Sequence, residues 1–214
     1  EAVPITTTIL ASLGTVELHL SAYGPDPAAI GARLDAAQAA LADRFGDDVV
    51  NRDGAPLEAT VGALLAERAF TVAAAESCTG GLVTTRLTDV PGASRYVDRA
   101  VVSYSNESKT ALLGVPPELI AEHGAVSEAV ACAMADGLRV RAGVTFGVAI
   151  TGVAGPGGGT PDKPVGLVCF AVSGPSGTRA KTSRFSGDRA VIRSLAATTA
   201  LDLLRREVIG SPRS

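Results

Sequence analysis

Ser77 and Cys78 stand side by side in the segment AESCTGGL, directly after an apolar run. Serine and cysteine are both common enzyme nucleophiles. Gly80 and Gly81 open a predicted helix, so their backbone N–H groups are expected to converge on an anion or a developing oxyanion. Serine and threonine are also ordinary helix caps, so this segment taken alone favours a structural interpretation.

Two other predicted strands end in comparable sequence. One is followed by SYSN, residues 103–106, and the other by Thr151, Gly152 and a long glycine-rich loop. Ligands of open α/β sheets bind at the carboxyl ends of the strands. Because polar or glycine-rich sequence recurs at three strand ends, the pattern favours a ligand site there.

A serine nucleophile needs a base, and Lys109 is the strongest candidate. His19 lies in the front part of the chain, and His123 lies at a predicted helix end, where a surface imidazole is favourable. Lys109 is one of three lysines and follows the second strand by one helical turn. A lysine that is partly buried among polar groups can lose its proton near neutral pH, although a helical lysine is usually solvated.

Cys78 is the alternative nucleophile, because thiolates are more reactive than alcohols and a helix N-terminus lowers a thiol pKa. No histidine is placed to assist it, and small cysteines often fill protein cores. We therefore rank Cys78 behind Ser77.

Two further features suit a phosphorylated substrate. Arg189 and Arg193 are four residues apart at the start of the last predicted helix, so they share a face, and their planar donors match phosphate. A salt bridge or a solvated face explains them equally well from the sequence. The loop GVAGPGGGTPDKP, residues 152–164, contains glycines that let the backbone approach a ligand. It is not a phosphate-binding P-loop, because no Gly-Lys-Ser/Thr follows.

The elements that position these residues alternate between strand and helix from residue 57 onward. The expected strands are 71–77, 99–105 and 144–151, followed by a hairpin over 165–186. The expected helices are 57–65, 80–90, a short one after 106, 116–124, 128–143 and 188–208. This order predicts an α/β fold, a mixed sheet covered by helices on both faces.

The first 53 residues form a separate predicted unit. Residues 6–24 are typical of two strands, and Asp26 with Pro27 predicts the start of a helix that ends at Gly46. A polar stretch with an Asp-Gly turn follows. We therefore predict a small α+β unit over 1–53 and an α/β domain over 54–214.

Composition narrows the functional class. The chain of 214 residues is 46% hydrophobic and 19% charged, with a net charge of -3, which favours a globular protein without a nucleic-acid partner. No apolar run reaches membrane-spanning length and no signal peptide is evident. Three dispersed cysteines provide neither a metal-binding spacing nor a disulfide framework. We expect a cytoplasmic protein without a metal or a membrane partner.

Four longer motifs follow one another along the chain: AESCTGGLVTTRLTDVPGAS, VSYSNESKTALLGVP, HGAVSEAVACAMADG and TGVAGPGGGTPDKPVGLV. Together they resemble the C-terminal domain of the CinA family, a nicotinamide mononucleotide deamidase domain. The likeness extends from about residue 57 to 208, and the front unit resembles the end of a KH-type domain. It implies a three-layer α/β/α sandwich and hydrolysis of a carboxamide without a cofactor.

The resemblance also implies roles for individual residues. Ser77 would be the nucleophile, Lys109 its general base, Tyr104 a holder of that pair and Thr151 a hydrogen-bonding partner of it. Arg189 is favoured over Arg193 as the nucleotide contact. The remaining expected substrate-binding residues are Thr79, Gly80, Gly81, Asn106, Gly152, Gly155 and Gly157.

Two other functions stay open at this level. A nucleotide-binding regulatory module with little turnover would fit the family's association with competence and DNA damage. A protein-interaction module would depend on the front unit. This unit has no basic surface, so we do not expect it to bind RNA. A homodimer is plausible for this family.

Overall fold

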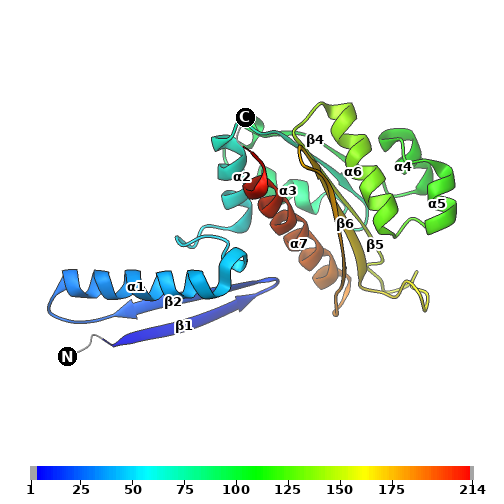
Figure 1. Cartoon of the computed structure of the whole chain (residues 1–214). Helices are drawn as coiled ribbons and strands as arrows, with labels where there is room; N and C mark the ends of the chain where they lie inside the picture. The colour runs from blue at the N-terminus through cyan, green and yellow to red at the C-terminus, as the bar shows by residue number, and fades with distance from the viewer. Residues whose placement is uncertain (1–3, 213–214) are drawn as a thin grey trace. The chain divides into compact units, whose positions relative to one another are not determined.

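The structure, a computed structural model, describes residues 4–212. The chain divides into two compact units, the first ending at Pro56 and the second beginning at Leu57. Figure 1 shows the elements of each unit.

The first unit is a hairpin with one long helix. Strands β1 (Ile5–Ser12) and β2 (Thr15–Ala22) pair antiparallel, and α1 (Pro27–Phe45) follows, with the short 3-10 helix η1 (Gly46–Asp48) behind it. The Asp26 carboxylate caps α1 by accepting the N–H groups of Ala28 and Ala29. The predicted strands, helix and cap are therefore confirmed, whereas the likeness to a KH-type domain stays a prediction.

The second unit is built on one mixed sheet of five strands in the order β4-β3-β5-β6-β7. Strands β4, β3 and β5 are parallel, and β5, β6 and β7 are antiparallel. The strands are β3 (Val72–Glu76), β4 (Val97–Val102), β5 (Phe146–Gly152), β6 (Leu167–Gly174) and β7 (Gly177–Arg184). The predicted mixed sheet is confirmed.

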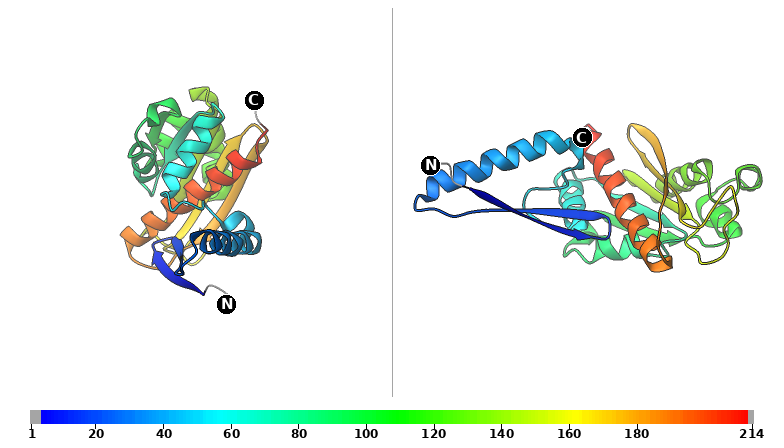
Figure 2. Two further views of the ribbon diagram at one scale, coloured as in Figure 1. Left: turned by 90° about the vertical axis from the view of Figure 1, so that its left-hand side faces the viewer. Right: turned by 90° about the horizontal axis from the view of Figure 1, so that it is seen from below.

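Helices cover both faces of this sheet. On one face α6 (Glu128–Ala142) packs against the strands, with α4 (Asn106–Leu113) and α5 (Pro117–His123) beside it. On the other face lies α7 (Arg189–Gly210), which packs against α2 (Leu57–Glu67) and α3 (Leu82–Thr88). A 3-10 helix, η2 (Ala93–Arg95), precedes β4. The two further views in Figure 2 show the same three layers.

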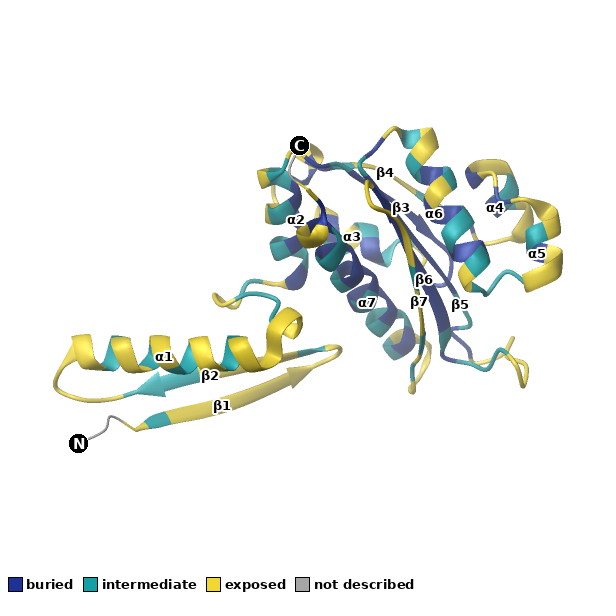
Figure 3. Ribbon diagram, in the orientation of Figure 1, coloured by how far each residue is buried: buried dark blue, intermediate teal, exposed yellow. Residues whose placement is uncertain are grey.

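The core belongs to the second unit. Every residue of β3 is buried, and the dark-blue strands in Figure 3 mark the same region. Small residues let α6 approach closely, since a Cβ added at Gly147 would lie 2.3 Å from the Ala135 carbonyl oxygen. A Cβ at Gly137 would lie 1.8 Å from the Leu113 carbonyl oxygen, so α4 and α6 also touch through their backbones.

One predicted strand has different bounds. The expected strand 99–105 begins at Val97 and ends at Val102. The Ser103 N–H donates to the Glu76 carbonyl, and Ser105 then becomes the N-cap of α4, with a reciprocal Ser105–Ser108 capping box. Tyr104 therefore lies in the turn between strand and helix.

Candidate active site

Ser77 lies directly beyond the carboxyl end of β3. Its N–H donates to the Ile150 carbonyl at 3.0 Å, which extends the pairing of β3 with β5 by one residue. Its hydroxyl lies 3.3 Å from the Lys109 Nζ. The two residues predicted as nucleophile and base, 32 positions apart in the chain, are therefore neighbours.

Lys109 lies in the first turn of α4 and is 1% exposed. Its Nζ also donates to the Ser103 carbonyl at 2.9 Å, and within the described chain no carboxylate forms an ion pair with it. Burial lowers the pKa of the Lys109 amine, opposed by the charges of Cys78 and Glu107. Such an environment favours the neutral amine, the form that can accept a proton.

Glu76 is a residue of this region that sequence reasoning missed. Its carboxylate is fully buried and accepts the N–H groups of Gly81 at 3.0 Å, Val83 at 3.1 Å and Thr84 at 2.9 Å. It also accepts the Thr84 hydroxyl at 2.7 Å. The sequence could have indicated this role, because a charged residue at the end of an apolar buried strand needs buried hydrogen-bond donors.

Gly80 and Gly81 do not present free N–H groups, which corrects the expectation for them. The Gly80 N–H donates to the Ser77 carbonyl at 3.1 Å, and the Gly81 N–H donates to Glu76. The backbone has a positive φ at both positions, +59° at Gly80 and +96° at Gly81, and this conformation favours glycine. The N–H groups of Cys78 and Thr79 differ, because no oxygen within residues 4–212 accepts from them.

A cavity of about 290 Å³ opens at Ser77. Most of the predicted site residues line it: Ser77, Tyr104, Asn106, Lys109, Thr151, Gly152, Gly155, Gly157 and Arg189. Cys78, Gly158 and the apolar residues Ala125, Val126, Val153 and Ala154 complete its wall. Thr79, Gly80, Gly81 and Arg193 lie outside this lining, so the structure does not bring them to the cavity.

Tyr104 and Arg189 form one contact at the cavity. The Arg189 guanidinium donates to the Tyr104 hydroxyl at 2.7 Å and to the Gly155 carbonyl at 2.8 Å. Among the described residues, Tyr104 has no hydrogen bond to Ser77 or Lys109. The expectation that Tyr104 holds this pair is corrected, since its hydroxyl is directed to Arg189.

Thr151 is likewise directed elsewhere. It is buried in the cavity wall, and its hydroxyl donates to the Ala125 carbonyl at 2.8 Å. The expected hydrogen bond from this hydroxyl to the Ser77–Lys109 pair is therefore not present. The bond instead joins the end of β5 to the segment that follows α5.

Arg193 contacts the chain rather than the cavity. Its guanidinium donates to the Cys78 carbonyl at 3.1 Å and to the Thr79 carbonyl at 2.7 Å. Of the two arginines, Arg189 alone lines the cavity. The expectation of Arg193 as a substrate contact is corrected, because its donors are directed to the turn after Ser77.

Cys78 is a poor nucleophile in this environment. The side chain is 5% exposed, and burial raises the pKa of its thiol to about 11. The expected lowering by a helix N-terminus does not occur, because burial and the nearby Glu76 charge outweigh the backbone N–H groups. Ser77, whose hydroxyl lies beside the buried Lys109 amine, is the better candidate nucleophile.

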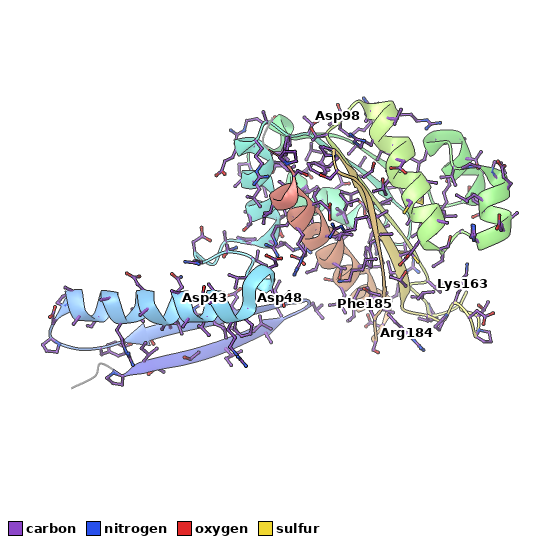
Figure 4. The ribbon with its side chains drawn as sticks, viewed as in Figure 1. Asp43, Asp48, Asp98, Lys163, Arg184 and Phe185 are labelled. Carbon is purple, nitrogen blue, oxygen red and sulfur yellow. The ribbon has the colours of Figure 1, made fainter. Side chains whose placement is uncertain are left out.

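The loop over residues 152–164 is irregular, as predicted, and it is tied down at both ends. The Val153 N–H donates to the Leu167 carbonyl at 2.8 Å, and Lys163, labelled in Figure 4, donates to the His123 carbonyl at the end of α5. Gly155 has φ +77°, and a Cβ there would lie 2.6 Å from Val165. The loop thus places backbone against the cavity.

Among residues 4–212 no group of three His, Cys, Asp or Glu side chains is arranged to hold a metal ion. No helix in this part of the chain is long and apolar enough to cross a membrane.

Residues 54–208 match the family model of the CinA C-terminal domain. A CinA-like protein of Acidobacterium capsulatum is 49% identical over 205 residues, which is 96% of this chain and 50% of that protein. A CinA-like protein of Mycobacterium tuberculosis is 53% identical over 175 residues, 81% of this chain and 40% of that protein. The chain therefore spans about half the length of the curated relatives it matches.

Solved structures agree. The competence damage-inducible protein A of Klebsiella pneumoniae superposes with a TM-score of 0.71 at 35% identity, covering 73% of this chain and 97% of that one. The competence/damage inducible protein CihA of Agrobacterium tumefaciens gives 0.67 at 38% identity, covering 71% and 96%. The α/β fold thus has structural counterparts among solved proteins. The chain belongs to the CinA family of competence- and damage-inducible proteins.

Proposed function

We propose that the chain is an amidohydrolase that converts nicotinamide mononucleotide to nicotinate mononucleotide and ammonia. The observation that carries this proposal is the buried Lys109 amine, 3.3 Å from the Ser77 hydroxyl at the cavity. The substrate comes from the family resemblance, and the reaction class comes from the side chains. A serine with an adjacent base is suited to acyl transfer.

In the first step the neutral Lys109 amine removes the Ser77 hydroxyl proton while the oxygen attacks the carboxamide carbon. The electron pair of the C=O π bond moves to oxygen and gives a tetrahedral oxyanion. The Ser103 carbonyl, 2.9 Å from Nζ, orients the amine and stabilises the ammonium that forms. Both groups are in place without rearrangement.

In the second step the Lys109 ammonium donates its proton to the amide nitrogen, the C–N bond breaks and ammonia leaves. The product is an ester between the nicotinoyl group and Ser77. Lys109 then takes a proton from water as the water oxygen attacks the ester carbon. It returns that proton to the Ser77 oxygen when the ester breaks, which releases the acid.

The oxyanion requires a donor, and the turn offers the N–H group of Cys78. Cys78 follows the nucleophile directly and lines the cavity, and no oxygen in the described chain accepts from its N–H. A donor of this type contributes about 3 kcal/mol to transition-state stabilisation. This group replaces the glycine N–H groups that the sequence suggested.

The other end of the cavity suits a phosphate. Arg189 uses two nitrogens for Tyr104 and Gly155, and a guanidinium has five N–H donors in total. Gly157 and Gly158 add backbone without side chains to the same wall. Arginine with adjacent backbone N–H groups is a favourable setting for a phosphomonoester.

The test is ammonia release from nicotinamide mononucleotide by the intact chain, by Ser77→Ala and by Lys109→Ala. We expect release by the intact chain and loss in both variants. Undiminished release by Ser77→Ala would move the nucleophile to Cys78 or to water. Binding of the nucleotide by the intact chain without ammonia would instead support a regulatory binding module, which the names of the relatives also accommodate.

A further inference from the structure

We propose that Arg193 is a positioning residue for this reaction: it holds the turn that follows Ser77 so that the Cys78 N–H faces the carboxamide oxygen. The inference rests on the proposed amidohydrolase function. It assigns Arg193 a role in the chemical step rather than in binding the nucleotide.

The contacts of Arg193 are directed to two consecutive carbonyls. Nε lies 3.1 Å from the Cys78 oxygen and one terminal nitrogen lies 2.7 Å from the Thr79 oxygen. Its position on α7 is fixed, because the neighbours Ile192 and Ala196 are buried in the core. A planar fork on a rigid helix therefore holds both peptides at once.

The geometry of the peptide bond converts these contacts into an orientation of N–H groups. In a trans peptide the C=O and the following N–H point in opposite directions. When Arg193 holds the Thr79 carbonyl, the Gly80 N–H must point away from α7, and it does so by donating to the Ser77 carbonyl at 3.1 Å. When Arg193 holds the Cys78 carbonyl, the Thr79 N–H must likewise point away from α7.

The Gly80 hydrogen bond carries this orientation one peptide back toward the nucleophile. Because the Ser77 carbonyl accepts the Gly80 N–H, the Cys78 N–H, which belongs to the same peptide as that carbonyl, points in the opposite direction. Cys78 lines the cavity beside Ser77, whereas Thr79 is fully buried outside the lining. The Cys78 N–H is therefore the backbone donor of this turn that is available to the carbonyl oxygen of a bound amide.

The positive charge of Arg193 acts on the same peptides that its hydrogen bonds orient. A guanidinium on a carbonyl oxygen polarises the whole peptide, which strengthens the hydrogen bond donated by its N–H. Glu76 fixes the turn from Gly81 onward through its backbone acceptors. Arg193 therefore controls the part that Glu76 does not reach, namely the two peptides after the nucleophile.

The experiment compares steady-state ammonia release from nicotinamide mononucleotide by the full chain, Arg193→Gln and Arg193→Lys, with Arg189→Lys as the matched control. For Arg193→Gln we expect kcat to fall by about 10²-fold with KM unchanged. Arg193→Lys should recover part of kcat, because an ammonium can hold one of the two carbonyls. Arg189→Lys should chiefly raise KM.

A second readout does not need turnover. A fluorophosphonate probe forms an oxygen–phosphorus bond at Ser77 and releases fluoride, and its phosphoryl oxygen would accept from the same donor. Arg193→Gln should slow this labelling, whereas Arg179→Gln, which replaces an exposed arginine of β7 outside the cavity, should leave it near the rate of the intact chain. If the intact chain is labelled but releases no ammonia, the proposed substrate is wrong and the labelling rates still decide the role of Arg193.

Two results would overturn the inference. One is an unchanged kcat and labelling rate in Arg193→Gln, shown to be folded by its melting temperature. The other is a raised KM with unchanged kcat, which would make Arg193 a nucleotide ligand. If Arg193→Gln does not fold, Arg193→Lys decides by the same comparison.

Discussion

Burial and hydrogen bonding together determine how readily the Lys109 side chain loses its proton. The side chain is 1% exposed, and the Ser77 hydroxyl and the Ser103 carbonyl surround its amine. Burial disfavours the ammonium, which lowers its pKa from the ordinary value of 10.5. Under the proposed mechanism, catalysis and stability are linked at this residue, because the neutral amine that would activate Ser77 is also the state that the fold tolerates best.

Both activity and stability should increase with pH over the range in which Lys109 loses its proton. Activity should rise with pH as Lys109 loses its proton at its lowered folded-state pKa. Stability should also rise with pH between that pKa and 10.5, because there the unfolded chain binds the proton and the folded chain does not. Melting temperatures across this range should show the slope in the intact chain and a smaller slope in Lys109→Met.

Lys109→Met separates the effect of the amine on activity from its effect on stability, because methionine fills a similar volume without charge. Ammonia release should fall by about 10²- to 10⁴-fold, the range typical of a lost general base. The melting temperature at neutral pH should stay the same or rise. A lower melting temperature at neutral pH would show that the amine contributes more to packing than its burial suggests.

Glu76→Gln tests the buried carboxylate. A glutamine amide would place an NH₂ group against backbone donors, leaving at least one buried N–H without an acceptor. We expect a loss of about 1–3 kcal/mol in the free energy of unfolding and reduced ammonia release, because Ser77 is the next residue. Thr84→Val, which removes only the hydroxyl donor at 2.7 Å, should have a smaller effect on both in urea unfolding and activity assays.

Among the elements, α4 and α6 are held together by backbone contact rather than by large side chains. Gly137 on α6 faces the carbonyl of Leu113, the last residue of α4. The start of the same short helix carries Lys109. The position of the Lys109 amine therefore depends on how closely the two helices approach.

Gly137→Ala should disturb this approach. The new Cβ would lie 1.8 Å from the Leu113 oxygen, so α4 has to shift. We expect destabilisation of about 1–3 kcal/mol together with lower kcat, measured by thermal melting and ammonia release. Gly210→Ala, at a helix position where an added Cβ meets nothing within 4 Å, is the control and should be near neutral.

At this scale the sequence allowed the elements to be predicted well and their contacts less well. Hydrophobic periodicity and the cap at Asp26 predicted the helices, and the structure confirms that cap and shows two more, at Ser127 and Asp188. The side-chain partners of Tyr104 and Thr151 could not be predicted. They depend on how α7 and the segment after α5 lie against the strand ends, and no local pattern records that placement.

For the chain as a whole, the buried core resides in the second unit. In the first unit no described residue is buried, and Ile9, Val16 and Leu18 are 64%, 65% and 37% exposed. Register places Ile9 opposite Leu18 on the hairpin. A unit of this size without a core of its own contributes little to stability by itself.

Removal of residues 1–53 should therefore leave a folded protein. We expect residues 54–214 to keep the melting temperature and the rate of ammonia release of the intact chain, as measured by calorimetry and assay. Loss of release in a truncated chain that melts normally would contradict the deamidase proposal. It would favour a function that depends on the first unit.

The bond from the Ser77 N–H to the Ile150 carbonyl joins residues 73 positions apart, and this has a consequence for folding kinetics. Helices α6 and α7 can form from local contacts, whereas the pairing of β3 with β5 must close a long loop first. The nucleophile is thus fixed only after the slow, long-range part of the sheet has assembled. During refolding, helical circular dichroism should recover before ammonia release, so enzymatic activity would report the last stage of folding.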